Sequence, residues 1–237
     1  TPNPEETETI VRKALDLGFT FFDTANTYSH GTSEEYLGRA IKNSVSRDKV
    51  ILATKDYFNE GHLSKKAIQR EIDGSLKRLN TDYVDLYIIH RFDRTTPIEE
   101  TMEALDGLVK CGKVRALGAS AMYGYQFYSM QVAAERNGWT KFCSMQNHYN
   151  LLYREDEREI IPLCKQEGVA LTPFSPLAAG RLARVEWKSD SPRSQMDRTA
   201  SQKYDGTQET DYEIVRRVHE TAEKHGATMT QVAIAWH

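Results

Sequence analysis

The chain has 237 residues, 39% of them hydrophobic, and its 34 acidic and 31 basic side chains leave a formal net charge of −3. This composition predicts a packed globular protein, and the balanced charge gives no reason to expect a nucleic acid or a membrane as partner. No apolar run approaches the roughly 20 residues that cross a bilayer, and the polar start resembles no secretory signal. Three scattered cysteines suggest neither a disulfide framework nor a metal site, so we expect a cytoplasmic protein.

The first predicted element is a helix that starts at Pro4. Asn3 offers an N-cap, and Glu6 stands three residues later, as in a capping box. This helix is expected to run to about Leu17. At the other end, Met229–His237 has a helical pattern with no capping Gly or Asn behind it, so we expect the sequence to be cut at both ends.

Six short apolar runs follow along the chain, and amphipathic segments separate them. The predicted strands are Phe19–Asp23, Val50–Lys55, Val84–His90, Val114–Ser120, Phe142–Gln146 and Val169–Ser175. They are mostly apolar on both faces, as parallel strands covered by helices are. Helices are predicted after Ser64, from Pro97 and from Arg158. Repeated strand–helix units indicate an α/β fold with right-handed crossovers.

Two α/β architectures compete, an open doubly wound sheet and a TIM (β/α)8 barrel. A doubly wound dinucleotide-binding sheet is expected to show GxGxxG after its first strand, and this sequence has none. Barrels gather functional side chains at the carboxyl ends of their strands, and polar residues stand at all six predicted ends: Asp23, Lys55, His90, Ser120, Gln146 and Ser175. We therefore predict a single barrel domain over residues 1–237. A closed barrel has eight strands, so the first and last are expected outside this sequence.

Four of the polar residues form a chemically coherent set. Lys55 would emerge from an apolar strand, where an isolated charge is costly, and Asp23 is the natural counter-ion. Tyr28 follows Asp23 closely, and an ammonium beside its phenol is expected to lower the phenol's pKa and favour proton donation. His90 offers a ring nitrogen to a substrate oxygen. Each residue alone has an ordinary structural explanation, and only their shared position at the strand ends indicates a common chemical role.

At these residues the sequence resembles the aldo-keto reductase family, most of all its microbial and fungal members. The resemblance covers nearly the whole chain in the stretches FFDTANTYSHGTSEEYLG, LATK, SLKRLNTDYVDLYIIH, GKVRALGAS and FSPLAAGRL. It places the family's catalytic residues on Asp23, Tyr28, Lys55 and His90. It implies hydride transfer from NAD(P)H to an aldehyde or ketone, with Tyr28 as proton donor, activated by Lys55 and Asp23, and His90 orienting the carbonyl. Relatives that reduce carbon–carbon double bonds have glutamate at the histidine position, so His90 indicates carbonyl reduction.

The resemblance also implies contacts with the cofactor, among them Asp23. Ser120 and Gln146 match residues that hold the nicotinamide carboxamide, although both also suit ordinary polar strand ends. Phe174 matches the aromatic ring on which the nicotinamide stacks. The loop over the pyrophosphate corresponds to Ser175, Leu177, Gly180 and Arg181. Many relatives have Asn where this chain has Ala121, so one carboxamide hydrogen bond is expected to be missing or supplied elsewhere. The family usually prefers NADPH, through residues matching a segment beyond His237, which leaves NADH open.

The substrate is less well defined than the cofactor. Tyr28 and His90 would face it, and Tyr57, Phe58 and Phe92 follow the catalytic strands and suit an apolar pocket for a small-molecule carbonyl compound. The polar stretch 183–211 is either a flap over the site or an insertion without function.

Two other functional classes remain open. Potassium-channel β subunits resemble the same family and act mainly as regulatory partners. A barrel lyase or isomerase is expected to show a cluster of metal-binding carboxylates, and none is evident. The physiological substrate and the oligomeric state stay open.

Overall fold

The computed structural model describes residues 3–187 and 202–237. The chain divides into two compact units, residues 1–146 with 163–170, and residues 147–162 with 171–237. The described residues form six strands: β1 (Phe21–Asp23), β2 (Ile51–Asp56), β3 (Val84–Ile89), β4 (Val114–Ser120), β5 (Phe142–Gln146) and β6 (Ala170–Leu171). The principal helices are α1 (Pro4–Asp16), α2 (Thr32–Ser44), α3 (Lys65–Leu79), α4 (Ile98–Lys110), α5 (Gly124–Asn137), α6 (Ile160–Glu167), α9 (Gln208–His225) and α10 (Met229–Ala235). The single domain over residues 1–237 stays a prediction.

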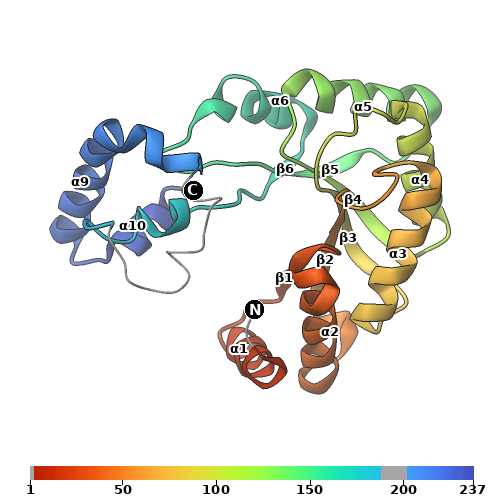
Figure 1. The fold of residues 1–237 in the computed structure, drawn as a ribbon, viewed down its shortest axis with the longest axis horizontal. Helices are drawn as coiled ribbons and strands as arrows, with labels where there is room; N and C mark the ends of the chain where they lie inside the picture. The colour runs from red at the N-terminus through yellow and green to blue at the C-terminus, as the bar shows by residue number, and fades with distance from the viewer. Residues whose placement is uncertain (1–2, 188–201) are drawn as a thin grey trace. The chain divides into compact units, whose positions relative to one another are not determined.

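The strands form one sheet in the order β1-β2-β3-β4-β5-β6, and the pairings from β1 to β5 are all parallel. Successive strands lie side by side because each is followed by a crossover that returns the chain to the same edge. The α/β class is confirmed, and the curled six-stranded sheet is consistent with part of a (β/α)8 barrel (Figure 1). All strands therefore end at one edge, where the polar residues of the sequence were expected to meet.

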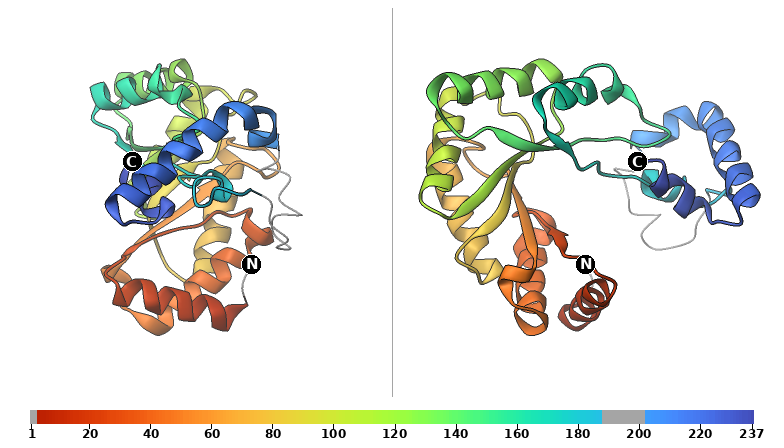
Figure 2. Two further views of the ribbon diagram at one scale, coloured as in Figure 1. Left: turned by 90° about the vertical axis from the view of Figure 1, so that its left-hand side faces the viewer. Right: turned by 180° about the vertical axis from the view of Figure 1, so that it is seen from behind.

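Helices α2 to α5 cover the outer face of the sheet in chain order, each packed against the next (Figure 1; Figure 2, right). Their boundaries follow local signals: Ser64 accepts a hydrogen bond from the Ala67 amide at the start of α3, and Asn80 ends that helix in the left-handed conformation. Helix α2 approaches α3 closely at Gly38. A Cβ atom there would collide with the backbone of Leu79, so this packing requires glycine.

Helix α1 begins as predicted. Asn3 accepts a hydrogen bond from the Glu6 amide at 2.8 Å, and the Glu6 carboxylate accepts one from the Asn3 amide at 3.1 Å, completing the capping box. The helix packs against α2, where Asn43 donates to Glu8 at 3.0 Å.

The sixth strand is shorter than the predicted run Val169–Ser175. Its two residues end before Pro173, which has no amide hydrogen to continue a ladder. Phe174 instead forms an isolated parallel bridge with His148, and its amide donates to the Asn147 carbonyl at 2.8 Å. Phe174 and Ser175 therefore belong to a loop and not to a strand.

The second unit has a core of its own, in which α9 and α10 pack together. Val215, Val218 and Ala222 of α9 pack with Met229 and Ala233 of α10. The loop predicted over 183–211 ends earlier than expected, because α9 already begins at Gln208. Residues 188–201 of that stretch lie outside the described residues.

Candidate active site

The carboxyl ends of β1 and β2 bring Asp23 and Lys55 together. The Lys55 side chain is completely buried, and its ammonium donates to Asp23 Oδ1 and, at 2.8 Å, to the carbonyl oxygen of Thr24. The other carboxylate oxygen of Asp23 accepts a hydrogen bond from Gln146 Nε2 at 2.9 Å. A buried ammonium requires such partners, since an unpaired charge out of water is strongly unfavourable. The predicted counter-ion pair is therefore present.

Tyr28 stands at the start of the short helical turn η1 (Tyr28–Gly31), five residues after Asp23. Its amide donates to the Ala25 carbonyl at 3.1 Å, and the next two residues have positive φ, 49° at Ser29 and 54° at His30. This tight turn keeps the tyrosine near the strand ends. The ring centroid lies 5.0 Å from Lys55 Nζ, and 39% of the residue is exposed. Tyr28 is therefore close to the ion pair while remaining accessible to a ligand.

His90 directly follows β3, and its amide extends the ladder by donating to the Asp56 carbonyl at 2.9 Å. Its ring meets that of Tyr28 edge-on, with the centroids 5.8 Å apart, and meets that of Phe58 edge-on at 5.0 Å. Asp23, Tyr28, Lys55, His90 and Gln146 thus share one corner of the first unit. The structure brings together all four residues that were expected to carry chemistry.

The electrostatics of Tyr28 differ from the expectation. Burial, reinforced by the negative charge of Asp23, raises the pKa of the phenol, and only the guanidinium of Arg91 acts in the opposite direction. We expected the Lys55 ammonium to lower this pKa. In the resting site the Asp23 carboxylate, which is paired with Lys55, opposes the effect of the ammonium on the phenol. Tyr28 consequently retains its proton near neutral pH, as a proton donor must.

His90 is a neutral imidazole near neutral pH. Burial, with the positive charges of Lys55 and Arg91 adding to it, lowers the pKa of His90 to about 3. Burial likewise lowers the pKa of Lys55, against the opposing effect of Asp23. A neutral imidazole presents one ring N–H as a hydrogen-bond donor and one nitrogen as an acceptor, which suits contact with a carbonyl oxygen.

The depressed pKa of His90 predicts a pH-dependent stability. Its folded-state pKa of about 3 lies below the ordinary 6.5, so the unfolded chain binds more protons between these values. The stabilisation is complete above pH 6.5 and is lost as the pH falls toward 3. Between pH 7.5 and 5.5 the wild type is expected to lose about 1.4 kcal/mol more unfolding free energy than a His90→Asn variant. Urea unfolding at both pH values measures this difference, and equal losses would contradict a neutral His90.

Ser120 and Gln146 stand opposite each other at the ends of β4 and β5. Their hydroxyl and side-chain amide groups supply both donors and acceptors, which fits the chemistry of a nicotinamide carboxamide. Ala121, the next residue, has a φ of 44°. This left-handed conformation costs a non-glycine residue roughly 1–2 kcal/mol and is better tolerated by asparagine. The departure from the family pattern therefore lies at a strained position of the site.

The residues expected at the ring and pyrophosphate of the cofactor belong to the second unit. Phe174 stacks on His148, with ring centroids 5.1 Å apart, and Lys203 Nζ lies 4.6 Å from the centre of its ring. The following loop, which contains Ser175, Leu177, Gly180 and Arg181, forms the turn η4 (Ala178–Gly180). The carbonyl oxygen of Ser175 accepts a hydrogen bond from Asn150 Nδ2 at 2.9 Å. The cofactor roles of these residues stay predictions.

Of the residues expected to line a substrate pocket, Tyr57 and Phe92 are half-buried and Phe58 is 52% exposed. Tyr57 stacks on His62 at 4.8 Å and meets Phe58 edge-on at 5.1 Å. Sequence reasoning missed Arg91, which directly follows His90 and whose guanidinium carbon lies 5.6 Å from the centre of the Phe58 ring. Its position next to a predicted catalytic residue could have identified it as a residue of the site.

Sequence reasoning also missed Asp56, the residue after Lys55. It is fully buried, and burial, with Glu71 adding to the effect, raises the pKa of its carboxyl to about 8. Because side chains alternate along a strand, Asp56 faces the helix layer while Lys55 faces the site. A protonated carboxyl in that layer avoids placing a second negative charge close to Glu71.

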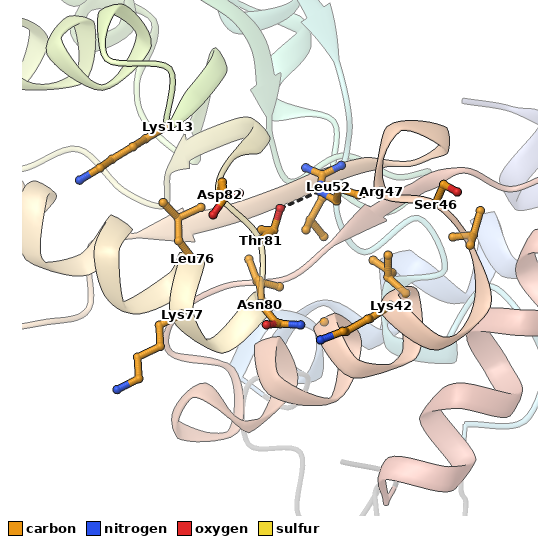
Figure 3. Close-up of a pocket in the computed structure, with 14 residues that line it drawn as sticks. Lys42, Ser46, Arg47, Leu52, Leu76, Lys77, Asn80, Thr81, Asp82 and Lys113 are labelled. Atoms are coloured by element: carbon orange, nitrogen blue, oxygen red, sulfur yellow. Dashed lines mark hydrogen bonds between the residues drawn. The ribbon is translucent and has the colours of Figure 1, made fainter.

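A separate cavity of about 880 Å³ lies away from these residues, at the amino-terminal side of β2 (Figure 3). Its walls include Leu52, Leu76 and Leu79, and its rim carries Lys42 and Lys77. Both lysines stand in the last turns of their helices, where cations stabilise the helix dipole. That role explains the basic rim, so the cavity's size alone does not make it the reaction site.

Within residues 3–187 and 202–237, no helix has both the length and the apolar character needed to span a membrane. The same residues contain no group of three or more His, Cys, Asp or Glu side chains placed to hold a metal ion.

Comparison with known proteins gives consistent matches over the full chain. The sequence model of the Aldo/keto reductase family matches residues 1–237. An aldo-keto reductase of Fusarium vanettenii is 45% identical over 264 residues, covering 99% of this chain and 71% of the relative. The versiconal hemiacetal acetate reductase of Aspergillus parasiticus is 44% identical over 260 residues, covering 99% and 75%. A Schizosaccharomyces pombe protein that carries the name aryl-alcohol dehydrogenase is 40% identical over 262 residues, covering 98% and 74%.

Proposed function

The chain belongs to the aldo/keto reductase family, and from this premise we propose that it reduces an aldehyde or ketone to the alcohol with Tyr28 as the proton donor. Membership makes the protein an oxidoreductase of small molecules with NAD(P)H as the family's cofactor. The relatives named above are fungal, in line with the resemblance noted from the sequence.

The observation that carries the proposal is the grouping of an ion pair, a phenol and a neutral imidazole. Tyr28 lies 5.0 Å from Lys55 Nζ, measured to the ring centre, and 5.8 Å from the ring of His90. A bound NAD(P)H would supply the hydride that reaches the carbonyl carbon. As negative charge develops on the carbonyl oxygen, Tyr28 gives that oxygen its phenolic proton, and His90 orients it through a hydrogen bond.

Lys55 and Asp23 have different roles in this proton transfer. The Lys55 ammonium stabilises the phenolate that remains after the proton has left, while Asp23 keeps the ammonium charged despite its burial. Burial keeps the phenol protonated until a substrate arrives. The transfer is thus favoured when charge appears on the substrate oxygen and disfavoured in the resting site.

We propose NADPH as the cofactor, held at its carboxamide by Ser120 and Gln146. The register that pairs Ser120 with Gln146, and the hydrogen bond from Gln146 to Asp23, support a polar recess beside the ion pair. Phe174, Ser175, Leu177, Gly180 and Arg181 are proposed to contact the rest of the cofactor on the strength of the family resemblance.

Turnover of a simple aryl aldehyde tests the function. Purified protein is expected to oxidise NADPH when 4-nitrobenzaldehyde is added and to yield the corresponding alcohol. The loss of NADPH absorbance measures the rate. The same assay with NADH compares the two cofactors. An absence of alcohol product with aryl and alkyl aldehydes alike, from protein that binds NADPH, would overturn the proposal and favour a regulatory role.

A further inference from the structure

Arg91 places a second cation at the mouth of the candidate site. It follows His90 directly, and its Nη1 donates to the His90 carbonyl oxygen at 2.7 Å. The guanidinium carbon lies 5.6 Å from the centre of the Phe58 ring, and that ring contacts the His90 imidazole edge-on. Its positive charge acts on the phenols of Tyr28 and Tyr57 and on the His90 imidazole. The guanidinium therefore borders the space in front of Tyr28.

This cation has no acidic partner among the described residues. Arg47 and Arg78, which are also partly buried, pair with Asp85 at 2.7 Å and with Glu34 at 2.6 Å. Arg91 is half-buried and contacts a carbonyl oxygen and an aromatic ring instead. Burial lowers its pKa, which reflects the cost of withdrawing the charge from water without a counter-ion. Such a group is suited to receive an anion.

We propose that Arg91 binds a carboxylate of the substrate, so that the preferred substrates are aromatic carbonyl compounds that carry a carboxylate. The proposal rests on the reductase function argued above. A planar guanidinium matches a carboxylate through two parallel hydrogen bonds. Phe58, with 52% of its surface exposed, offers an aromatic face beside that contact. Arg91 would hold the anionic end of the molecule while Tyr28 and His90 receive the carbonyl oxygen.

The test compares two aldehydes that differ in charge, 4-carboxybenzaldehyde and its neutral methyl ester, at pH 7. The measured quantity is the ratio of their kcat/KM values. Arg91→Gln is expected to lower this ratio by about tenfold to a hundredfold, the range of a charge-assisted hydrogen bond. The ratio for Arg91→Lys is expected to lie between those of the wild type and Arg91→Gln, because lysine keeps the charge but lacks the planar guanidinium. Arg94→Gln, at an exposed arginine three residues away, is expected to keep the wild-type ratio.

The ratio separates recognition from structural support. An Arg91 that merely supports the loop would alter both aldehydes alike and leave the ratio unchanged, which would overturn the proposal. The proposal would also be overturned if Arg91→Gln lost affinity for NADPH while the ratio stayed constant, because the anion bound by Arg91 would then be a phosphate of the cofactor. If these two aldehydes, 4-nitrobenzaldehyde and alkyl aldehydes all fail to be reduced, the reductase proposal fails, and calorimetric binding of 4-(hydroxymethyl)benzoate still decides the role of Arg91. Binding that is equally strong in the wild type and in Arg91→Gln would reject it.

Discussion

Replacing Tyr28 with phenylalanine is expected to lower kcat by on the order of 10²–10⁴-fold, the usual contribution of a positioned general acid. The substitution removes the hydroxyl and leaves the ring whose centre lies 5.0 Å from Lys55 Nζ and 5.8 Å from that of His90. Packing and the shape of the site are therefore retained. The dissociation constant for NADPH, measured by fluorescence titration, is expected to stay within about twofold, because the hydroxyl serves the substrate oxygen.

A matched control distinguishes this effect from a general loss of a phenol. Tyr128 lies on α5, where 47% of the residue is exposed, and Tyr128→Phe is expected to reduce 4-nitrobenzaldehyde at the wild-type rate. Full activity of the Tyr28→Phe variant would falsify the assignment of Tyr28 as proton donor. A parallel loss of cofactor binding would instead assign Tyr28 to the cofactor site.

The positions of the chemically active residues were predictable because the ends of the strands can be located in the sequence. Lys55 and His90 each follow a run that is apolar on both faces, and parallel strands bring such ends to one edge. The capping signals at Asn3 and Ser64 were equally direct, since each depends on side chains only three residues apart. Most of the fold could therefore be predicted from local capping signals and from the pattern of apolar residues in the strands.

Properties that depend on distances across the fold were not predictable in the same way. The pKa of Tyr28 is raised because burial and Asp23 outweigh the other charges, and neither burial nor that balance follows from spacing. Asp56 was missed because a carboxylate is not expected to be fully buried. The early end of β6 was a missed local signal, because Pro173 interrupts the predicted run.

Removing Asp23 is expected to destabilise the protein more than removing the lysine that it pairs with. Lys55 is completely buried, whereas 29% of the Asp23 side chain is exposed. Asp23→Asn strands an ammonium out of water and is expected to cost about 3–5 kcal/mol. Lys55→Met leaves a carboxylate that still reaches solvent and accepts from Gln146 at 2.9 Å, so its cost is expected to be smaller. Urea unfolding of both variants measures the difference.

The double variant separates stability from chemistry. Asp23→Asn combined with Lys55→Met removes both charges and is expected to recover most of the stability lost in Asp23→Asn alone, giving a non-additive cycle. It is nevertheless expected to remain inactive, because no ammonium is left to stabilise the Tyr28 phenolate. The loss of unfolding free energy in Asp23→Asn is also expected to become smaller as the pH rises. The folded-state pKa of Lys55 lies below its ordinary value, so the unpaired ammonium loses its proton at a lower pH in the folded protein than in the unfolded chain. Additive destabilisation, or activity in the double variant, would contradict the role given to this ion pair.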